Sequence, residues 1–205
     1  MSAIADAFVA AMGKPNPPST PGLHFADERM QASWDRIQAE VGAGWFLNHF
    51  LCLFAEGLDS LGACLDAWSF LVPPSSSERL IAGRNAYGAI LVVENSTKDL
   101  GGLGEVHVLD PTAVAYWSHP DLYLRSMIGS WLPHNEIPHF LEHELYDAWL
   151  QQSGRYLVDD EILAMRAPRG LGGAMTLDNF YPENIFSYYE TTGPIYAKAF
   201  PRKEG

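Results

Sequence analysis

Four short runs of Val, Ile, Leu and aromatic residues follow one another between residues 79 and 117. They cover residues 79–82, 89–94, 105–109 and 112–117, and turn-forming residues separate them. Runs of this length, broken by Gly, Asn and Pro, are typical of strands joined by tight turns. The segment therefore predicts a small antiparallel meander, and the remaining sequence has to pack around it.

The residues before this meander have helical character. Residues 2–12 predict one short helix, and the proline-rich residues 14–22 predict a linker or extended arm. A second helix is expected to begin near Asp27, where apolar residues recur at helical spacing, namely Met30, Trp34, Ile37 and Val41. Residues 45–55 are apolar nearly all round and predict a buried helix, and residues 61–71 predict a further short one.

The residues after the meander also predict mostly helices. These are expected over residues 121–132, 137–152 and around 183–190, with a tight glycine turn at residues 170–173. The fold class is therefore α+β, with N-terminal helices packed on a small antiparallel sheet and a mainly helical C-terminal part. We expect an N-terminal arm or linker over residues 1–22 and two packed parts over residues 23–117 and 118–205.

The acidic residues are unevenly distributed. The chain has 25 Asp and Glu against 13 Lys and Arg, a formal net charge of −12. Residues 105–161 hold ten of those acids and only two of the bases. Direct binding to nucleic acid is unexpected, because phosphate neutralisation needs clustered Lys and Arg. The acidic segment is either a docking surface for a basic protein or an ordinary solvated face.

The number of cysteines and the hydropathy pattern bear on the cellular compartment that we expect for this protein. Cys52 and Cys64 are too few for a disulfide framework, and their spacing fits no metal knuckle. No apolar run approaches the roughly 20 residues that a membrane span needs. We therefore expect a cytoplasmic protein that does not bind membranes and whose thiols are buried.

One short motif suggests a metal site. His139, Glu142 and His143 form a His-x-x-Glu-His pattern, the arrangement of inverted zinc peptidases when it lies on a helix. A third ligand would have to come from Glu183 or Glu190. The alternative is a solvated helix face whose apolar side packs inward. A zinc-dependent hydrolase therefore stays open as a second hypothesis.

Three stretches carry a resemblance to a known family. They are residues 78–92 (ERLIAGRNAYGAILV), residues 105–111 (EVHVLDP), and residues 160–163 (DEIL) followed by Pro168, Gly170–Gly173 and Asp178-Asn179. In this order they resemble the two-part immunity proteins that bacteria carry against type VI secretion DNase effectors. Those proteins have an N-terminal GAD-like domain and a small C-terminal immunity domain. The resemblance covers roughly residues 25–195.

The resemblance implies a cytoplasmic binding protein without catalytic residues or cofactor. It would form a one-to-one complex with a cognate basic toxin and cover the active or DNA-binding surface of that nuclease. The carboxylates expected to contact the toxin are Glu142, Glu144, Asp147, Asp159, Asp160 and Glu161. A general acidic interaction module that binds no toxin is the remaining alternative.

Overall fold

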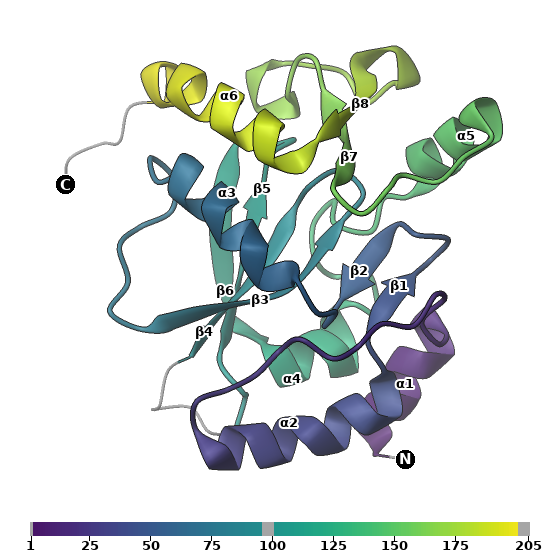
Figure 1. The fold of residues 1–205 in the computed structure, drawn as a ribbon, viewed down its shortest axis with the longest axis vertical. Coiled ribbons are helices and arrows are strands. Elements are labelled where there is room, and N and C mark those ends of the chain that lie inside the picture. Colours follow the sequence, from purple (N-terminus) through teal and green to yellow (C-terminus); the bar gives the residue numbers. More distant parts are fainter. Residues whose placement is uncertain (1, 96–100, 201–205) are drawn as a thin grey trace.

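A six-stranded antiparallel sheet forms the centre of the molecule in the computed structural model, which describes residues 2–95 and 101–200 (Figure 1). Each strand pairs with the next one along the chain, so that the sheet is a meander throughout. The strands are β1 (Gly44–Phe46), β2 (Leu51–Leu53), β3 (Glu78–Asn85), β4 (Ile90–Asn95), β5 (Glu105–Asp110) and β6 (Ala115–Tyr123). The meander predicted over residues 79–117 is confirmed, and two strands precede it.

The middle of this sheet is buried on both faces. In β4, Ile90 and Val92 belong to one hydrophobic cluster, while Leu91 and Val93 belong to the other. All four side chains are fully buried. A strand covered on both faces is a continuous apolar run without polar alternation, which is why the sequence pattern of β4 identifies it so clearly.

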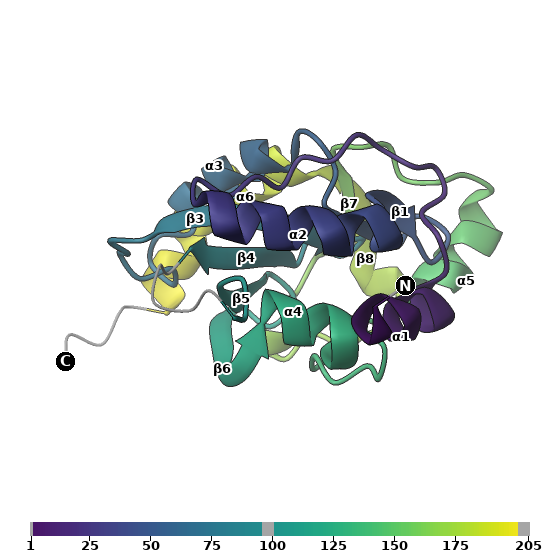
Figure 2. The ribbon, with the colours of Figure 1, turned by 90° about the horizontal axis from the view of Figure 1, so that it is seen from below.

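Helices cover the two faces of the sheet (Figure 2). On one side lie α1 (Ala3–Met12), α2 (Glu28–Val41) and the short α4 (Leu124–Ser126), and on the other α3 (Gly62–Ala67) and α6 (Ile185–Ala199). The Asp27 side chain caps α2 by accepting hydrogen bonds from the backbone N–H groups of residues 29 and 30. The predicted helices at residues 2–12 and from Asp27 are thus confirmed.

The proline-rich residues after α1 form an extended strap over residues 16–22. Backbone hydrogen bonds join the strap to β1 and to the end of β2, from Ser19 N–H to the Ala43 carbonyl (2.8 Å) and from Gly22 N–H to the Phe54 carbonyl (2.8 Å). Isolated bridges link Pro18 with Gly44 and Pro21 with Ala55. The arm therefore covers the edge strand, whose backbone would otherwise be open to other chains.

The C-terminal part contains a second sheet and is not mainly helical. The strands β7 (Glu161–Met165) and β8 (Phe180–Asn184) pair antiparallel, and Asn184 then caps α6. The helix α5 (Glu144–Ser153) begins seven residues later than expected. This part of the fold prediction is wrong, because the short apolar run 161–165 carries no periodicity that separates a strand from a helix.

Three further segments differ from their predictions. Residues 45–55 form β1 and β2 with a turn at residues 47–49, where a buried helix was expected. The helix expected over residues 61–71 shortens to a 3₁₀ turn, η1 (Leu58–Leu61), and the single α3. In residues 121–132, β6 continues to Tyr123, and α4 leads into a π-helix over Met127–Trp131. The first of these segments is apolar nearly throughout, so it lacks the periodicity that would distinguish strands from a helix in advance.

The predicted division at residue 117 falls inside β6. Both hydrophobic clusters contain residues from before and after that position, for example Trp34 with Leu163, and Trp68 with Tyr189. Residues 201–205 of the second predicted part lie outside the described residues. The two-domain division stays a prediction.

No helix within residues 2–95 and 101–200 combines the length and apolar character needed to cross a membrane.

Close packing of α6 on α3 predicts a strong effect of one methyl group. A Cβ at Gly193 would lie 2.3 Å from the Ala67 carbonyl oxygen. We expect Gly193→Ala to lower the free energy of unfolding by about 1–3 kcal/mol through overpacking, measured by urea denaturation. The control is Gly62→Ala, where no atom lies within 4 Å and the backbone is helical. It should be neutral or stabilising by up to about 1 kcal/mol, and equal losses in both variants would contradict this packing argument.

Candidate functional site

Two adjoining cavities hollow the surface on the α3 side of the sheet. The first has a volume of about 700 Å³ and lies between the strap, η1, α3 and β3. The second has a volume of about 350 Å³ and lies between the strap, β1–β2, η1 and residues 159–160. Glu56 and Gly57 line both, so the two cavities meet at that point.

Five exposed carboxylates line these two cavities, and we call the combined hollow the acidic groove. They are Glu56, Asp59, Asp66, Asp159 and Asp160. None of the five side chains makes a hydrogen bond or ion pair with another residue in the described parts of the chain. Of the two arginines in the groove, Arg79 already pairs with Glu94 (2.7 Å). The acidic groove is therefore a hollow with unpaired negative charge.

Arg84 lies beneath the second cavity and is almost completely buried, with 2% of its surface exposed. Its guanidinium donates hydrogen bonds to the backbone carbonyls of Asn85, Asp159 and Glu161 (the last at 3.2 Å). Burial lowers the pKa of this guanidinium, and no carboxylate in the described chain lies within ion-pairing distance of it. Its role is to hold the backbone of residues 159–161, which places two of the groove carboxylates.

A stack of rings continues outward from Arg84 to the surface. The guanidinium carbon lies 4.9 Å from the centroid of the Trp45 ring, His49 stacks on Trp45, and Tyr156 stacks on His49 with centroids 4.3 Å apart. The turn that carries His49 has three consecutive non-glycine residues at positive φ, namely 50°, 54° and 65° at residues 47–49. Such backbone persists only where the surroundings hold it, and here the stack does so.

Two large apolar side chains are exposed in this region, Tyr156 at the outer end of the stack and Val158 two residues later. Tyr156 is 52% exposed and Val158 is 62% exposed, and they directly precede the groove carboxylates Asp159 and Asp160. Aromatic residues of this kind supply most of the binding energy at protein interfaces, whereas exposed charges mainly guide the encounter. Two exposed apolar side chains thus lie just before the groove carboxylates Asp159 and Asp160 in the chain.

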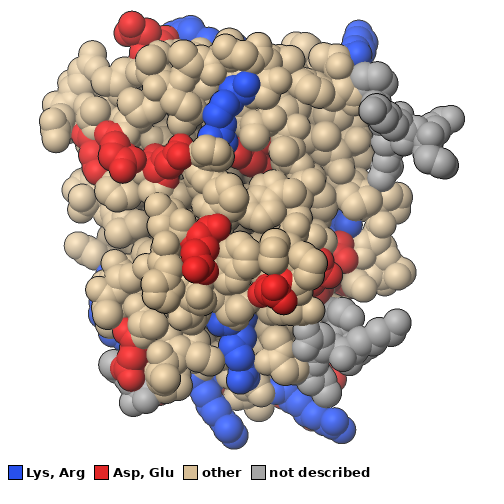
Figure 3. All heavy atoms as spheres, turned by 180° about the vertical axis from the view of Figure 1, so that it is seen from behind, with Lys and Arg blue, Asp and Glu red and all other residues tan. Residues whose placement is uncertain are grey.

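The structure separates the six predicted contact residues into two groups. Asp159 and Asp160 line the groove, and Glu144 is exposed and unpaired on α5 within the described chain. The other three are engaged: Glu142 bonds His139 (2.6 Å), Asp147 bonds His143 (2.7 Å), and Glu161 pairs with Arg155 (2.6 Å). Figure 3 shows the face opposite to that of Figure 1, where acidic side chains form a band across its upper and middle parts.

Sequence reasoning missed three of the groove carboxylates. Glu56, Asp59 and Asp66 lie outside residues 105–161, the acidic segment on which the sequence prediction was based. They come together with Asp159 and Asp160 only because η1 and α3 pack beside the start of β7. The one available signal was that residues 45–77 hold these three acids and no Lys or Arg, which does not indicate their distant neighbours.

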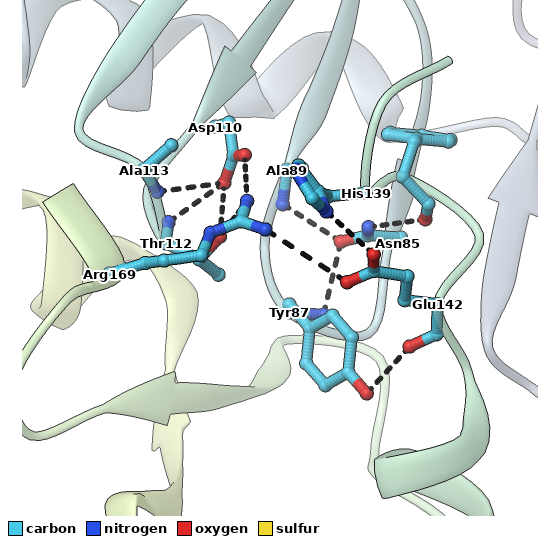
Figure 4. A network of polar contacts seen from close by, with 10 residues as sticks. Asn85, Tyr87, Ala89, Asp110, Thr112, Ala113, His139, Glu142 and Arg169 are labelled. Carbon is cyan, nitrogen blue, oxygen red and sulfur yellow. Dashed lines mark hydrogen bonds and ion pairs between the residues drawn. The ribbon is translucent and has the colours of Figure 1, made fainter. Parts of the chain in front are cut away.

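A polar network beside the groove residues joins four segments (Figure 4). The Asn85 side chain accepts from the backbone N–H groups of Tyr87 and Ala89 and donates to the Phe140 carbonyl (2.9 Å). The Tyr87 hydroxyl donates to the Glu142 carbonyl (2.9 Å). These buried bonds fix residues 137–143 against the β3–β4 turn, which explains why this segment need not be helical.

Arg169 connects the same network to the β5–β6 turn. Its guanidinium bonds Asp110 (2.9 Å) and the Thr112 hydroxyl (2.9 Å), and it lies 3.9 Å from Glu142 (Figure 4). Asp110 also accepts from the backbone of residues 112 and 113. Asp110 and Glu142 are thus structural partners of a cation, and the tight glycine turn after Pro168 is fixed in place by them.

The residues of the His-x-x-Glu-His motif do not lie on a helix, although the zinc hypothesis requires one. His139, Glu142 and His143 lie in turns before α5, with His139 at a φ of 59°. Each histidine uses its Nδ1 to contact a different carboxylate, Glu142 or Asp147. Within residues 2–95 and 101–200, no group of three or more His, Cys, Asp or Glu side chains is arranged to hold a metal ion. The helix that the alternative zinc hypothesis requires over these residues is therefore absent, since α5 begins only at Glu144.

The fold has a counterpart among solved structures. A scan against protein-family models finds no match, and a search of curated proteins finds none either. The crystal structure of Atu4351 from Agrobacterium tumefaciens is similar, with a TM-score of 0.60 over 92% of this chain and 87% of that one. The two sequences are 14% identical. This similarity establishes a shared fold.

Removing one hydroxyl from the polar network should destabilise the chain measurably. The Tyr87 hydroxyl donates to Glu142 and accepts from the Tyr146 N–H (3.2 Å), and both are buried or half-buried. We expect Tyr87→Phe to lower the unfolding free energy by about 1–3 kcal/mol, because two backbone groups lose their partner. Chemical denaturation measures this. The exposed Tyr156→Phe serves as control, and a Tyr87→Phe loss no larger than in that control would contradict the assignment.

The buried thiols should resist alkylation until strongly alkaline pH. Burial raises the pKa of Cys52 to about 11 and that of Cys64 to about 12, from a usual value near 9. Because the folded pKa values are raised, the contribution of the two neutral thiols to the free energy of unfolding is complete below about pH 9. It is lost as the pH rises through about 11 for Cys52 and about 12 for Cys64. Iodoacetamide should label neither cysteine at pH 8 in native protein and both in urea. Rapid native labelling of Cys52, which lines the second cavity, would show that this thiol is accessible and ionised.

Proposed function

We propose that this chain is a cytoplasmic immunity protein that binds and inhibits a secreted basic toxin of the type VI DNase class. The observation that carries the proposal is the acidic groove with its five unpaired carboxylates, two of which follow the exposed Tyr156 by three and four residues in the chain. The resemblance of residues 78–92, 105–111 and 160–179 to such immunity proteins supports it. The chain acts by binding and carries out no catalysis.

The charge of the groove suits the surface of a nuclease. A DNase must present Lys and Arg to the DNA phosphates, and these are available to an inhibitor that offers carboxylates in their place. Opposite potentials on the two proteins raise the association rate at low salt. Because exposed ion pairs contribute little to affinity, the stability of the complex must come from apolar contacts such as those of Tyr156 and Val158.

Covering the DNA-binding surface is sufficient for inhibition in this proposal. The groove runs between the strap, η1, α3 and residues 159–160, so one toxin would contact segments that are distant in the sequence. A contact built this way requires the folded protein, because an isolated acidic peptide would supply only one wall. The complex is expected to be one-to-one.

Neutral variants of the groove test the proposal against the protein encoded by the neighbouring gene. We expect the purified wild-type chain to bind that protein one-to-one and to abolish its DNase activity. The double variants Asp159→Asn/Asp160→Asn and Glu56→Gln/Asp59→Asn should lower the association rate about tenfold at low salt, because steering is lost. Tyr156→Ala should raise the dissociation constant at least fivefold, as expected for an anchor worth more than about 1 kcal/mol.

The matched control removes the same charge outside the groove. Asp178→Asn/Glu190→Gln neutralises two exposed carboxylates that line neither cavity, and its association rate should stay close to wild type. Absence of a complex with a toxin from the neighbouring gene would overturn the proposal. So would equal effects of the groove and control variants. Binding to a basic partner that is not toxic would instead identify a general acidic interaction module.

A further inference from the structure

A third cavity lies on the opposite side of the sheet, between α1, α2 and α4. Its volume is about 490 Å³. The apolar part of its lining comes from Ile4, Ile37 and Ala39, and the polar part includes Ser33, Arg36 and Arg125. None of these residues lines the acidic groove. This cavity is therefore separate from the acidic groove.

The two arginines of this cavity have no partner within residues 2–95 and 101–200. Neither Arg36 nor Arg125 makes a side-chain hydrogen bond or an ion pair with a described residue. The Nε atom of Arg125 is also shielded from solvent without a hydrogen-bond partner. A shielded N–H of a charged group that lacks an acceptor is costly. In contrast, Arg79, Arg84 and Arg169 all donate to oxygen atoms.

The carboxylate that lines this cavity, Glu40, is engaged at its edge. It accepts hydrogen bonds from the backbone N–H of Ser2 (2.7 Å) and from the Ser2 hydroxyl (2.8 Å). These bonds lower the pKa of Glu40 and keep it ionised at the start of α1. The two guanidinium groups thus remain available for another acceptor.

The backbone next to Arg125 is unusual. The five-residue π-helix Met127–Trp131 begins two residues later and packs against α1, where Ile4 lies 3.4 Å from a Cβ built at Gly129. A π-helix is rare in proteins and occurs frequently at functional sites. Its position beside the unpaired arginine is consistent with a ligand site.

We propose that this cavity binds an amphipathic carboxylate, an anionic head on a short hydrocarbon chain. The guanidinium groups of Arg36 and Arg125 would receive the carboxylate, whose two oxygens match their paired N–H donors. Ile4, Ile37 and Ala39 would contact the chain, as is usual for sites with an apolar lining and few polar groups. The proposal is independent of toxin binding, since it uses other residues on the other side of the sheet.

The test measures binding of decanoate, with decanol and decyltrimethylammonium as probes of equal chain length. Isothermal titration calorimetry should show saturable one-to-one binding of decanoate, at least tenfold tighter than either probe. Arg125→Gln and Arg36→Gln should each weaken decanoate binding about tenfold or more, because one charged hydrogen-bonding group is lost. Binding should also weaken as salt is added.

The control is Arg29→Gln, which removes an exposed arginine from the same helix α2 but outside the cavity. It should leave the decanoate affinity unchanged. Should Arg125→Gln fail to fold, the exposed Arg36→Gln gives the same readout. The proposal is overturned if decanoate does not saturate, if decanol binds equally well, or if Arg29→Gln weakens binding as much as Arg36→Gln.

Discussion

The guanidinium of Arg84 connects the central sheet to the rest of the molecule. It is a buried charge without a carboxylate partner in the described chain, and it is solvated by backbone carbonyls of residues 85, 159 and 161 together with the face of Trp45. Such a group tolerates burial only when its hydrogen bonds are satisfied. The positions of β3, of the residues before β7 and of the β1–β2 turn therefore depend on one another. The acidic groove exists because these three segments meet there.

The central sheet could be predicted from the sequence, whereas its surroundings could not. The run from Ile90 to Val93 is apolar, β-branched and bounded by turns, so local pattern and tertiary position agree. The segment 45–55 is equally apolar, but its strands depend on a turn at residues 47–49 with three consecutive positive φ values. Asn48 and His49 tolerate positive φ better than most residues, but Leu47 does not, so the turn could not be predicted from residue types alone. The C-terminal sheet was missed for a related reason, because β7 and β8 are separated by fourteen residues of turns and short 3₁₀ helices.

The candidate site shows the same limit at the level of single residues. Asp159 and Asp160 were accessible to sequence reasoning because they lie in an acidic segment. Glu142 and Asp147 lie there too, yet each is bonded to a histidine, and charge counting cannot distinguish a paired carboxylate from a free one. Glu56, Asp59 and Asp66 enter the groove only through long-range packing. The net charge of each segment thus identified an acidic part of the surface. The contacts of each side chain in the structure decide which carboxylates are free to bind a partner.

The strap over residues 16–22 has an evolutionary consequence. It is joined to the sheet through backbone N–H and carbonyl groups, while Thr20, Pro21 and Ser19 line the groove. Side chains at such positions can be exchanged without removing the bonds that hold the segment in place. The chemistry of one wall of the groove can therefore diverge between related chains at little cost in stability, as long as Gly22 keeps its close approach to the Ala55 carbonyl. A scaffold of this kind can acquire new binding preferences by substitution in a few consecutive residues.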